Sequence, residues 1–177
     1  MTVRGLLLAA GAGSRMGVPK ALVDDWLVRA VRTLRDGGCD GVTVVLGADA
    51  ALAAELLEGV EADVVVAADW ADGMGASLRV GLAGLDADAA LVSLVDLPDL
   101  DAEVVRRVLG AGAAAATLRR ATYDGRPGHP VLIGRDHWAG VSEIAMGDRG
   151  ARDYLAARDV ETVECGDLAT GMDVDSR

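Results

Sequence analysis

The sequence of 177 residues contains no phenylalanine, few other aromatic residues, two cysteines and a single lysine, Lys20. Because aromatic side chains are so scarce, the core has to be built from Ala, Val and Leu. Cys39 and Cys165 lie far apart, without a CxxC pair or neighbouring histidines, which argues against a structural zinc site and a disulfide scaffold. We expect both to be ordinary thiols of a reducing compartment.

Long apolar runs are missing as well. No segment approaches the roughly 20 apolar residues of a membrane span. The opening MTVRGLLLAAGAG has too short an apolar run for a secretory signal, and a charged, glycine-rich motif follows at once. The net charge of −11 argues against a general nucleic-acid surface, which needs basic patches. We therefore expect a cytoplasmic protein that binds neither membranes nor nucleic acid.

The first two thirds of the chain alternate between short apolar runs and segments of helical periodicity. We expect strands over 3–10, 41–47, 62–68 and 89–98, and helices over 27–38, 50–59, 75–85 and 101–112. The strands are apolar throughout, which is typical of a parallel sheet covered on both faces. With right-handed crossovers, this pattern predicts a three-layer α/β domain.

The alternation weakens in AAAATLRRATYDGRPGHPVLIG, where two extended stretches flank a Gly/Pro-rich turn and predict an antiparallel excursion. A late helix is expected over 147–159 and a late strand over 160–166. No linker, repeat or low-complexity segment interrupts the chain, so we expect residues 1–177 to form one domain.

The segment LLLAAGAGSRMGVPK leaves the first strand at the carboxyl edge of the sheet, where ligands of such folds gather. Gly11 and Gly13 permit tight turns and let backbone N–H groups approach an anion closely. A structural turn and a phosphate-binding loop both fit these glycines. A Walker A motif is excluded because Ala21 follows the lysine, and the dinucleotide fingerprint is excluded because Met16 stands at its third glycine.

The lysine favours the phosphate loop. A chain that otherwise uses arginine has its one lysine directly after this loop. Lys20 is a compact point charge that fits a tight phosphate pocket, whereas arginine needs room for its planar fork. Together with Arg15, it supplies the charge that a polyphosphate requires.

The sequence LLAAGAGSRMGVPKAL resembles the signature of the MobA/MocA-like nucleotidyltransferases, and most closely their molybdenum-cofactor cytidylyltransferase branch. Further matches follow in order: DWADGMGASLRVGL, LVSLVDLPDL, YDGRPGHPVLIG, GDRGARDYL and MDVDSR. The resemblance implies a three-layer αβα sandwich with a mostly parallel, Rossmann-like sheet of the nucleotide-diphospho-sugar transferase type. It also implies a nucleotide site formed by Leu8, Ala9, Ala10, Gly11, Gly13, Ser14, Arg15, Lys20, Ser77 and Asp96, with Arg15 and Lys20 as catalytic residues.

Asp96 ends an apolar strand just before a proline. A carboxylate at this position can hold Mg²⁺ against a nucleotide phosphate, and a turn-forming aspartate is the alternative. The resemblance makes Asp96 a metal ligand and favours Asp175 as the second. Asp173 and Asp175 alternate on an extended segment, so we expect only one of them to reach the metal. A frayed acidic tail is the other interpretation.

Ser77 stands near the start of a glycine-rich helix, where we expect it to act as the N-cap. The resemblance places Ser77 near the base and Arg79 near the phosphate path. It puts His129, Asp148, Arg149 and Arg152 on the acceptor side, where a turn histidine and a solvated helix face are the alternatives.

We therefore predict a Mg²⁺-dependent enzyme that transfers CMP from CTP, in preference to GTP, to a phosphate-bearing acceptor. The resemblance implies molybdopterin as the acceptor, and a molybdoenzyme or its chaperone as the candidate protein partner. Three alternatives stay open: a sugar-phosphate nucleotidyltransferase, a non-catalytic molybdenum-cofactor binding protein, and an oxidoreductase of a nicotine-derived dye, as some relatives are described. Compared with relatives, the loop after Leu22 is shortened and a Pro-Glu-Asp segment after MDVDSR is absent, which bears on specificity and activity.

Overall fold

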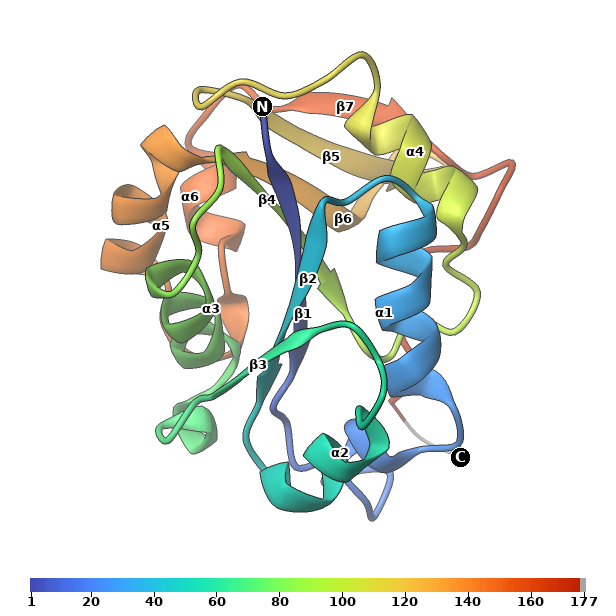
Figure 1. Cartoon of the computed structure of the whole chain (residues 1–177). Coiled ribbons are helices and arrows are strands. Elements are labelled where there is room, and N and C mark those ends of the chain that lie inside the picture. Colours follow the sequence, from blue (N-terminus) through green and yellow to red (C-terminus); the bar gives the residue numbers. More distant parts are fainter. Residues whose placement is uncertain (176–177) are drawn as a thin grey trace.

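A computed structural model of the chain describes residues 1–175. Seven strands form one sheet in the order β3-β2-β1-β4-β6-β5-β7 (Figure 1). The strands are β1 (Val3–Ala9), β2 (Gly41–Leu46), β3 (Asp63–Val66), β4 (Ala89–Leu94), β5 (Leu118–Tyr123), β6 (Arg126–Gly134) and β7 (Glu161–Glu164). Only β6 runs antiparallel to its neighbours, so the predicted mostly parallel sheet is confirmed.

Helices cover both faces of the sheet, which confirms the three-layer αβα architecture. One face carries α1 (Trp26–Asp36), α2 (Ala50–Leu56) and α4 (Ala102–Leu109), and the other carries α3 (Met74–Ala83), α5 (Trp138–Ile144) and α6 (Arg152–Ala156) (Figure 1). Successive strand residues point to opposite faces. Leu7 therefore belongs to the core under α1, and its neighbours Leu6 and Leu8 belong to the core under α3.

The register of the central strands brings their carboxyl ends to one edge. Leu8 of β1 lies opposite Leu94 of β4, and Ala9 lies opposite Leu46 of β2. The glycine loop after β1 and the aspartate after β4 therefore leave the sheet side by side. This edge, at the bottom of Figure 1, is where the fold assembles its candidate site.

The predicted antiparallel excursion is the hairpin β5–β6. Its turn consists of Asp124 and Gly125, whose φ angles of 50° and 76° suit the tight two-residue connection that Asp-Gly favours. The Gly/Pro-rich stretch lies inside β6 and not in the turn. The chain therefore turns at Asp124 and Gly125, before most of the Gly/Pro-rich stretch in which the turn was expected.

Two helical segments differ from the sequence prediction. Helix α5 was not predicted, because WAGVSEI is short and carries a glycine that raises the cost of a helix. The helix expected over 147–159 is a 3-10 turn at Gly147–Arg149 followed by α6 at Arg152–Ala156. Gly150, with φ of 53°, separates the two pieces.

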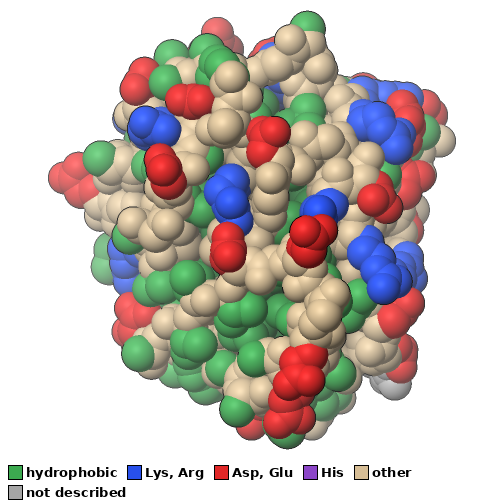
Figure 2. Space-filling model, viewed as in Figure 1, with side chains coloured by type: hydrophobic (Ala, Val, Ile, Leu, Met, Phe, Trp, Pro, Cys, Tyr) green, Lys and Arg blue, Asp and Glu red, His purple; other side chains and the backbone are tan. Residues whose placement is uncertain are grey.

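Strand β3 is an edge strand with an apolar surface. Val64 and Val66 are exposed there, as are Leu52 and Leu56 around α2. Figure 2 shows apolar side chains gathered on the lower part of this face, where β3 and α2 lie, while Lys and Arg side chains stand as separate spots without a continuous basic surface.

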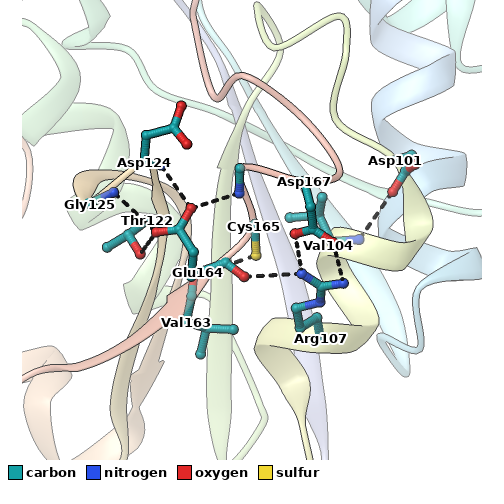
Figure 3. A network of polar contacts seen from close by, with 11 residues as sticks. Asp101, Val104, Arg107, Thr122, Asp124, Gly125, Val163, Glu164, Cys165 and Asp167 are labelled. Atoms are coloured by element: carbon teal, nitrogen blue, oxygen red, sulfur yellow. Dashed lines mark hydrogen bonds and ion pairs between the residues drawn. The ribbon is translucent and has the colours of Figure 1, made fainter.

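Glu164, at the end of β7, holds the hairpin turn in place (Figure 3). Its carboxylate accepts hydrogen bonds from the amides of Asp124, Gly125 and Gly166 at 2.8–3.1 Å, and from the Thr122 hydroxyl at 2.9 Å. These backbone hydrogen bonds lower the pKa of Glu164 to about 2. The ionised carboxylate therefore ties β7 to the β5–β6 turn.

None of the helices within residues 1–175 is long and apolar enough to cross a membrane. Both cysteines are buried free thiols. A single domain over residues 1–177 stays a prediction, and the joining of all seven strands into one sheet supports it.

The Glu164 network predicts a stability difference that depends on pH. The pKa of Glu164 in the folded protein is below its ordinary value of 4.5, so its stabilisation is fully present above pH 4.5 and is lost as the pH falls towards 2. Glu164→Gln should lower the Tm at pH 6, and the gap to the wild type should shrink between pH 4.5 and 2. Thermal melts across this range test it, with the exposed α5 variant Glu143→Gln as the control. A gap that stays constant with pH would contradict the assignment.

Candidate active site

A cleft of about 540 Å³ opens at the carboxyl edge of β1 and β4. All ten residues predicted for nucleotide binding line it, together with Asp148 and Asp175. Its other walls come from residues that the sequence analysis did not single out: Ala12, Trp70, Ala71, Gly73, Met74, Leu94 and Val95. Trp70 and Met74 lie in the quoted segment DWADGMG. Trp70 could have been predicted as a cleft residue, because it is an aromatic residue that closely follows a predicted strand at this edge of the sheet.

The glycine loop turns tightly at Gly13. The Gly13 carbonyl accepts hydrogen bonds from the amides of Met16 and Gly17, both at 2.9 Å. Its φ is 62°, and a Cβ at this position would lie 2.0 Å from the Val18 carbonyl oxygen, so only glycine fits. A Cβ on Gly11 would meet no atom within 4 Å. Gly11 therefore leaves open space at the cleft, which suits the close approach of a ligand.

Lys20 joins the loop to two carboxylates. Its Nζ lies 2.5 Å from Asp96 and 2.7 Å from Asp175. The Lys20 and Asp96 side chains are 19% and 11% exposed, so this ion pair is largely shielded from water. Arg15 lies farther out, with an exposed guanidinium 3.4 Å from Asp175.

The electrostatics of these three groups follow from burial and from each other's charge. Burial lowers the pKa of Lys20, but hydrogen bonds with Asp175 and Asp96 outweigh it, so the pKa is raised overall. Burial raises the pKa of Asp96 against the opposing effect of Lys20. The hydrogen bond from Lys20 lowers the pKa of exposed Asp175. The cluster thus holds a protonated lysine between two carboxylates.

The segment after β7 crosses the molecule to reach this cluster. The Thr170 amide and hydroxyl donate to the Asp99 carboxylate at 2.7 and 2.6 Å. Farther along, the Val174 amide donates to the Asp96 carbonyl at 3.0 Å. These bonds place Asp175 at the end of β4.

One ligand atom each of Asp96, Asp173 and Asp175 lie within 4.8 Å of one another. Both Asp173 and Asp175 therefore come close to Asp96, although the alternation of an extended segment predicted that they would point opposite ways. That expectation assumed a regular strand, whereas residues 171–175 form none and turn at Gly171, with φ of 68°. The sequence analysis considered Asp173 together with Asp175 and favoured Asp175, and the structure adds Asp173 to the cluster.

Two roles expected around α3 differ in the structure. Ser77 is not the N-cap: the helix begins at Met74 with Gly73 as its N-cap, and Ser77 is buried one turn later, where it lines the cleft. Arg79 does not line the cleft. Its guanidinium donates to the Ala145 carbonyl and lies 3.8 Å from Asp69, so it joins α3 to the end of α5.

Of the four residues expected on the acceptor side, only Asp148 lines the cleft. Arg149 is exposed and pairs at 2.8 Å with Asp153 of the following helix α6. His129 lies in β6 and Arg152 at the start of α6, both outside the cleft. The resemblance grouped these four residues, and the structure places Asp148 in the cleft and the other three outside it.

A mostly parallel αβα sheet, with a glycine loop, a lysine and carboxylates at its carboxyl edge, is the architecture of the α/β nucleotidyltransferases. Residues 5–163 match the MobA-like NTP transferase domain, and the chain belongs to that family.

Relatives found by sequence and by structure match almost the whole chain and carry different names. The chain is 36% identical over 189 residues to a protein named nicotine blue oxidoreductase from Paenarthrobacter nicotinovorans, covering 98% of this chain and 92% of that one. A nucleotidyl transferase from Methanothermobacter superposes with a TM-score of 0.85 at 20% identity, covering 99% and 92%. Rv0371c from Mycobacterium tuberculosis gives a TM-score of 0.82 at 26% identity, covering 99% and 94%, and its structure with manganese gives 0.78.

The path of the C-terminal segment predicts the effect of a single methyl group. A Cβ on Gly171 would lie 2.1 Å from Cδ2 of the buried Tyr123 ring, so Gly171→Ala has to displace the segment. We expect the Val174 amide to exchange its hydrogen about three- to tenfold faster, the effect of losing one hydrogen bond. Gly59→Ala is the matched control, because Gly59 has a similar φ of 75° but open space around it. Equal exchange in both variants would contradict the tether.

Proposed function

We propose that this protein is a Mg²⁺-dependent nucleotidyltransferase that transfers CMP from CTP to a phosphate-bearing acceptor, with molybdopterin as the preferred acceptor. The observation that carries the proposal is Lys20, held between Asp96 and Asp175 directly beside the glycine loop of the cleft. Membership of the MobA-like NTP transferase family supports it. We also place the protein in the cytoplasm.

The carboxylates fit a divalent cation. Asp96, Asp173 and Asp175 offer hard oxygen donors within 4.8 Å, which is the chemistry that Mg²⁺ and Mn²⁺ favour. The manganese in the Rv0371c structure supports such a site in this family. Asp96 and Asp175 would hold the ion, with Asp173 beside them. When bound, a divalent cation neutralises phosphate charge.

The protein's own groups position the triphosphate and balance its charge. Gly11 and Gly13 line the cleft, and backbone amides of this loop can donate to phosphate oxygens there. Lys20 has three donors, of which two contact carboxylates, so one is free for a phosphate. Arg15, exposed at the rim, can reach the leaving pyrophosphate.

The reaction needs no protein nucleophile. An anionic phosphate oxygen of the acceptor forms a bond to the α-phosphorus as the bond to the β-phosphate oxygen breaks, and that oxygen leaves on pyrophosphate with the electron pair. No proton has to move because the attacking oxygen is already ionised. The contribution of the protein is therefore positioning and charge stabilisation, which dominate phosphoryl-type transfers.

The relative named nicotine blue oxidoreductase favours a second candidate function, the reduction of a dye-like substrate. Such a reaction would need a hydride donor, and the loop lacks the third glycine of a dinucleotide fingerprint, with Met16 in its place. Pyrophosphate release with CTP would support the transferase. Oxidation of NADPH or NADH without pyrophosphate release would support the oxidoreductase.

Removal of the Lys20 charge tests the proposed role of the loop. Lys20→Ala should lower turnover by at least about a hundredfold, the scale of losing one electrostatic stabiliser. The measurement is pyrophosphate release with CTP and molybdopterin. Lys20→Arg keeps the charge and should recover only part of the activity, because the planar guanidinium does not fit between the carboxylates. Near-normal pyrophosphate release by Lys20→Ala would contradict the proposed role of Lys20.

Asp96→Asn tests the metal site. The substitution removes the buried carboxylate of the cluster, so we expect Mn²⁺ binding measured by electron paramagnetic resonance to weaken and metal-dependent activity to be lost. Asp148→Asn is the control, since Asp148 lines the cleft outside the carboxylate cluster. If Asp96→Asn binds Mn²⁺ as the wild type does, Asp96 is only a turn residue.

Ala10 is proposed to set the choice of base. It directly follows β1 and lines the cleft, and a purine bound against this strand end would press on its methyl group. We expect CTP to be preferred over GTP by roughly ten- to two-hundredfold in kcat/KM, the scale of a small steric difference. Ala10→Gly should narrow this ratio. A wild-type preference for GTP would overturn the base assignment and leave the transferase proposal standing.

A further inference from the structure

Two consecutive arginines on β5 have opposite surroundings. Arg119 pairs with Glu161 at 2.8 Å, and its Nη1 donates to backbone carbonyls at the end of α4. Arg120 faces the other side of the sheet. Its Nη2 donates to the Gly128 carbonyl at 3.3 Å, while its Nε is buried without a hydrogen-bond partner. A buried donor without an acceptor is costly, and no residue in the described part of the chain supplies an acceptor for the Arg120 Nε–H group.

Two further basic side chains lie around Arg120. His129 directly follows the carbonyl that Arg120 contacts, and it is half-buried. Burial, and after it the charge of Arg120, lowers the pKa of His129 to about 4. Burial, and after it the charge of Arg152 on α6, lowers the pKa of Arg120. Arg120 thus lies close enough to act on His129 and to be acted on by Arg152.

No acid balances this cluster. Within residues 1–175, no carboxylate lies within the 4.0 Å ion-pair distance of Arg120, His129 or Arg152. Most of the described arginines do have such a partner, as expected in a chain with 28 acidic and 17 basic residues. Two unpaired arginines and a histidine at one place are therefore an arrangement for an outside anion.

The cluster lies beside the cleft. Strand β6 separates β5 from β4, whose residue Leu94 lines the cleft. Two inter-strand spacings put β5 about 10 Å from β4. On the helical side, Asp148 of the cleft is in the 3-10 turn that leads directly into α6. A molecule bound in the cleft would therefore have to extend over β6 to reach Arg120.

We infer that Arg120, His129 and Arg152 form an anion subsite that holds a second phosphate or carboxylate group of the acceptor, about 10 Å from β4. This inference rests on the proposed function, because it assumes that the acceptor enters beside the triphosphate. It adds a requirement that the proposed function lacks: the acceptor carries two anionic groups, one that attacks and one that Arg120 holds. Arg120 supplies the buried donor, and neutral His129 supplies a ring N–H.

Inorganic phosphate tests the subsite by nuclear magnetic resonance. The chain has only two histidines, so the imidazole signals are simple to assign. Phosphate at constant ionic strength should shift the His129 signal in a saturable way. The His137 signal should stay in place, since that ring already contacts the Tyr154 hydroxyl and the Ala116 carbonyl. Arg120→Gln should weaken phosphate binding at His129 about ten- to a hundredfold, the loss of a charged hydrogen bond.

Two control variants show whether the His129 response reports phosphate at this subsite, and not phosphate at the glycine loop or a change in net charge. Lys20→Ala should leave the His129 response intact, and Arg32→Gln, which removes an exposed charge on α1, should do the same. Arg152→Gln is an exposed change that spares the fold and should also weaken the response. A His129 signal that does not saturate, or that responds to phosphate in Arg120→Gln and Arg152→Gln as strongly as in the wild type, would overturn the subsite.

A separate experiment measures the rise in Tm that CTP with Mg²⁺ produces in the wild type and in Arg120→Gln. An unchanged shift in Arg120→Gln supports a subsite that serves the acceptor and not the nucleotide, and a lost shift contradicts it. If the wild type shows no shift with CTP, the proposed function fails, and the phosphate titration still decides whether the anion site exists.

Discussion

The ion pair between Lys20 and Asp96 is the contact around which the candidate site is built. It joins the loop after β1 to the end of β4, and Asp175 completes it from the C-terminal segment. Because Asp96 is largely buried, removal of the Lys20 charge leaves its carboxylate uncompensated, which is costly in a protein interior. The parallel register of β1 and β4 makes this meeting possible, since it brings both strand ends to one edge.

A series of further contacts positions Asp175, the third member of this cluster. Glu164 fixes the turn of the β5–β6 hairpin to β7, and Arg107 pairs with Asp167 just beyond it (Figure 3). From there Thr170 is held by Asp99, and Val174 by the Asp96 carbonyl. Residues 170–175 are thus tethered beside the candidate site. Family members with different names can share this scaffold, because the activity depends on what the cleft accepts.

The strands and most helices could be predicted because their apolar periodicity is strong and local. The grouping of the loop with Asp96 followed from the rule that parallel strands end at one edge. Three features could not be predicted. Helix α5 is too short to leave a clear pattern, the close approach of Asp173 depends on an irregular segment turned at Gly171, and Arg120 shows its missing partner only when its surroundings are known. The family resemblance placed Arg79 near the phosphate path, but its guanidinium donates a hydrogen bond to the carbonyl of Ala145 at the end of α5.

The central claim is that the carboxylate and lysine cluster holds a metal-bound triphosphate, and calorimetry tests it most directly. The wild-type protein is titrated with a CTP analogue whose α,β-bridging oxygen is replaced by a methylene group, with and without Mn²⁺. The account predicts saturable binding of one analogue per chain that strengthens markedly when Mn²⁺ is present. Binding of equal strength without the metal, or no binding alongside tight binding of NADPH, would contradict it.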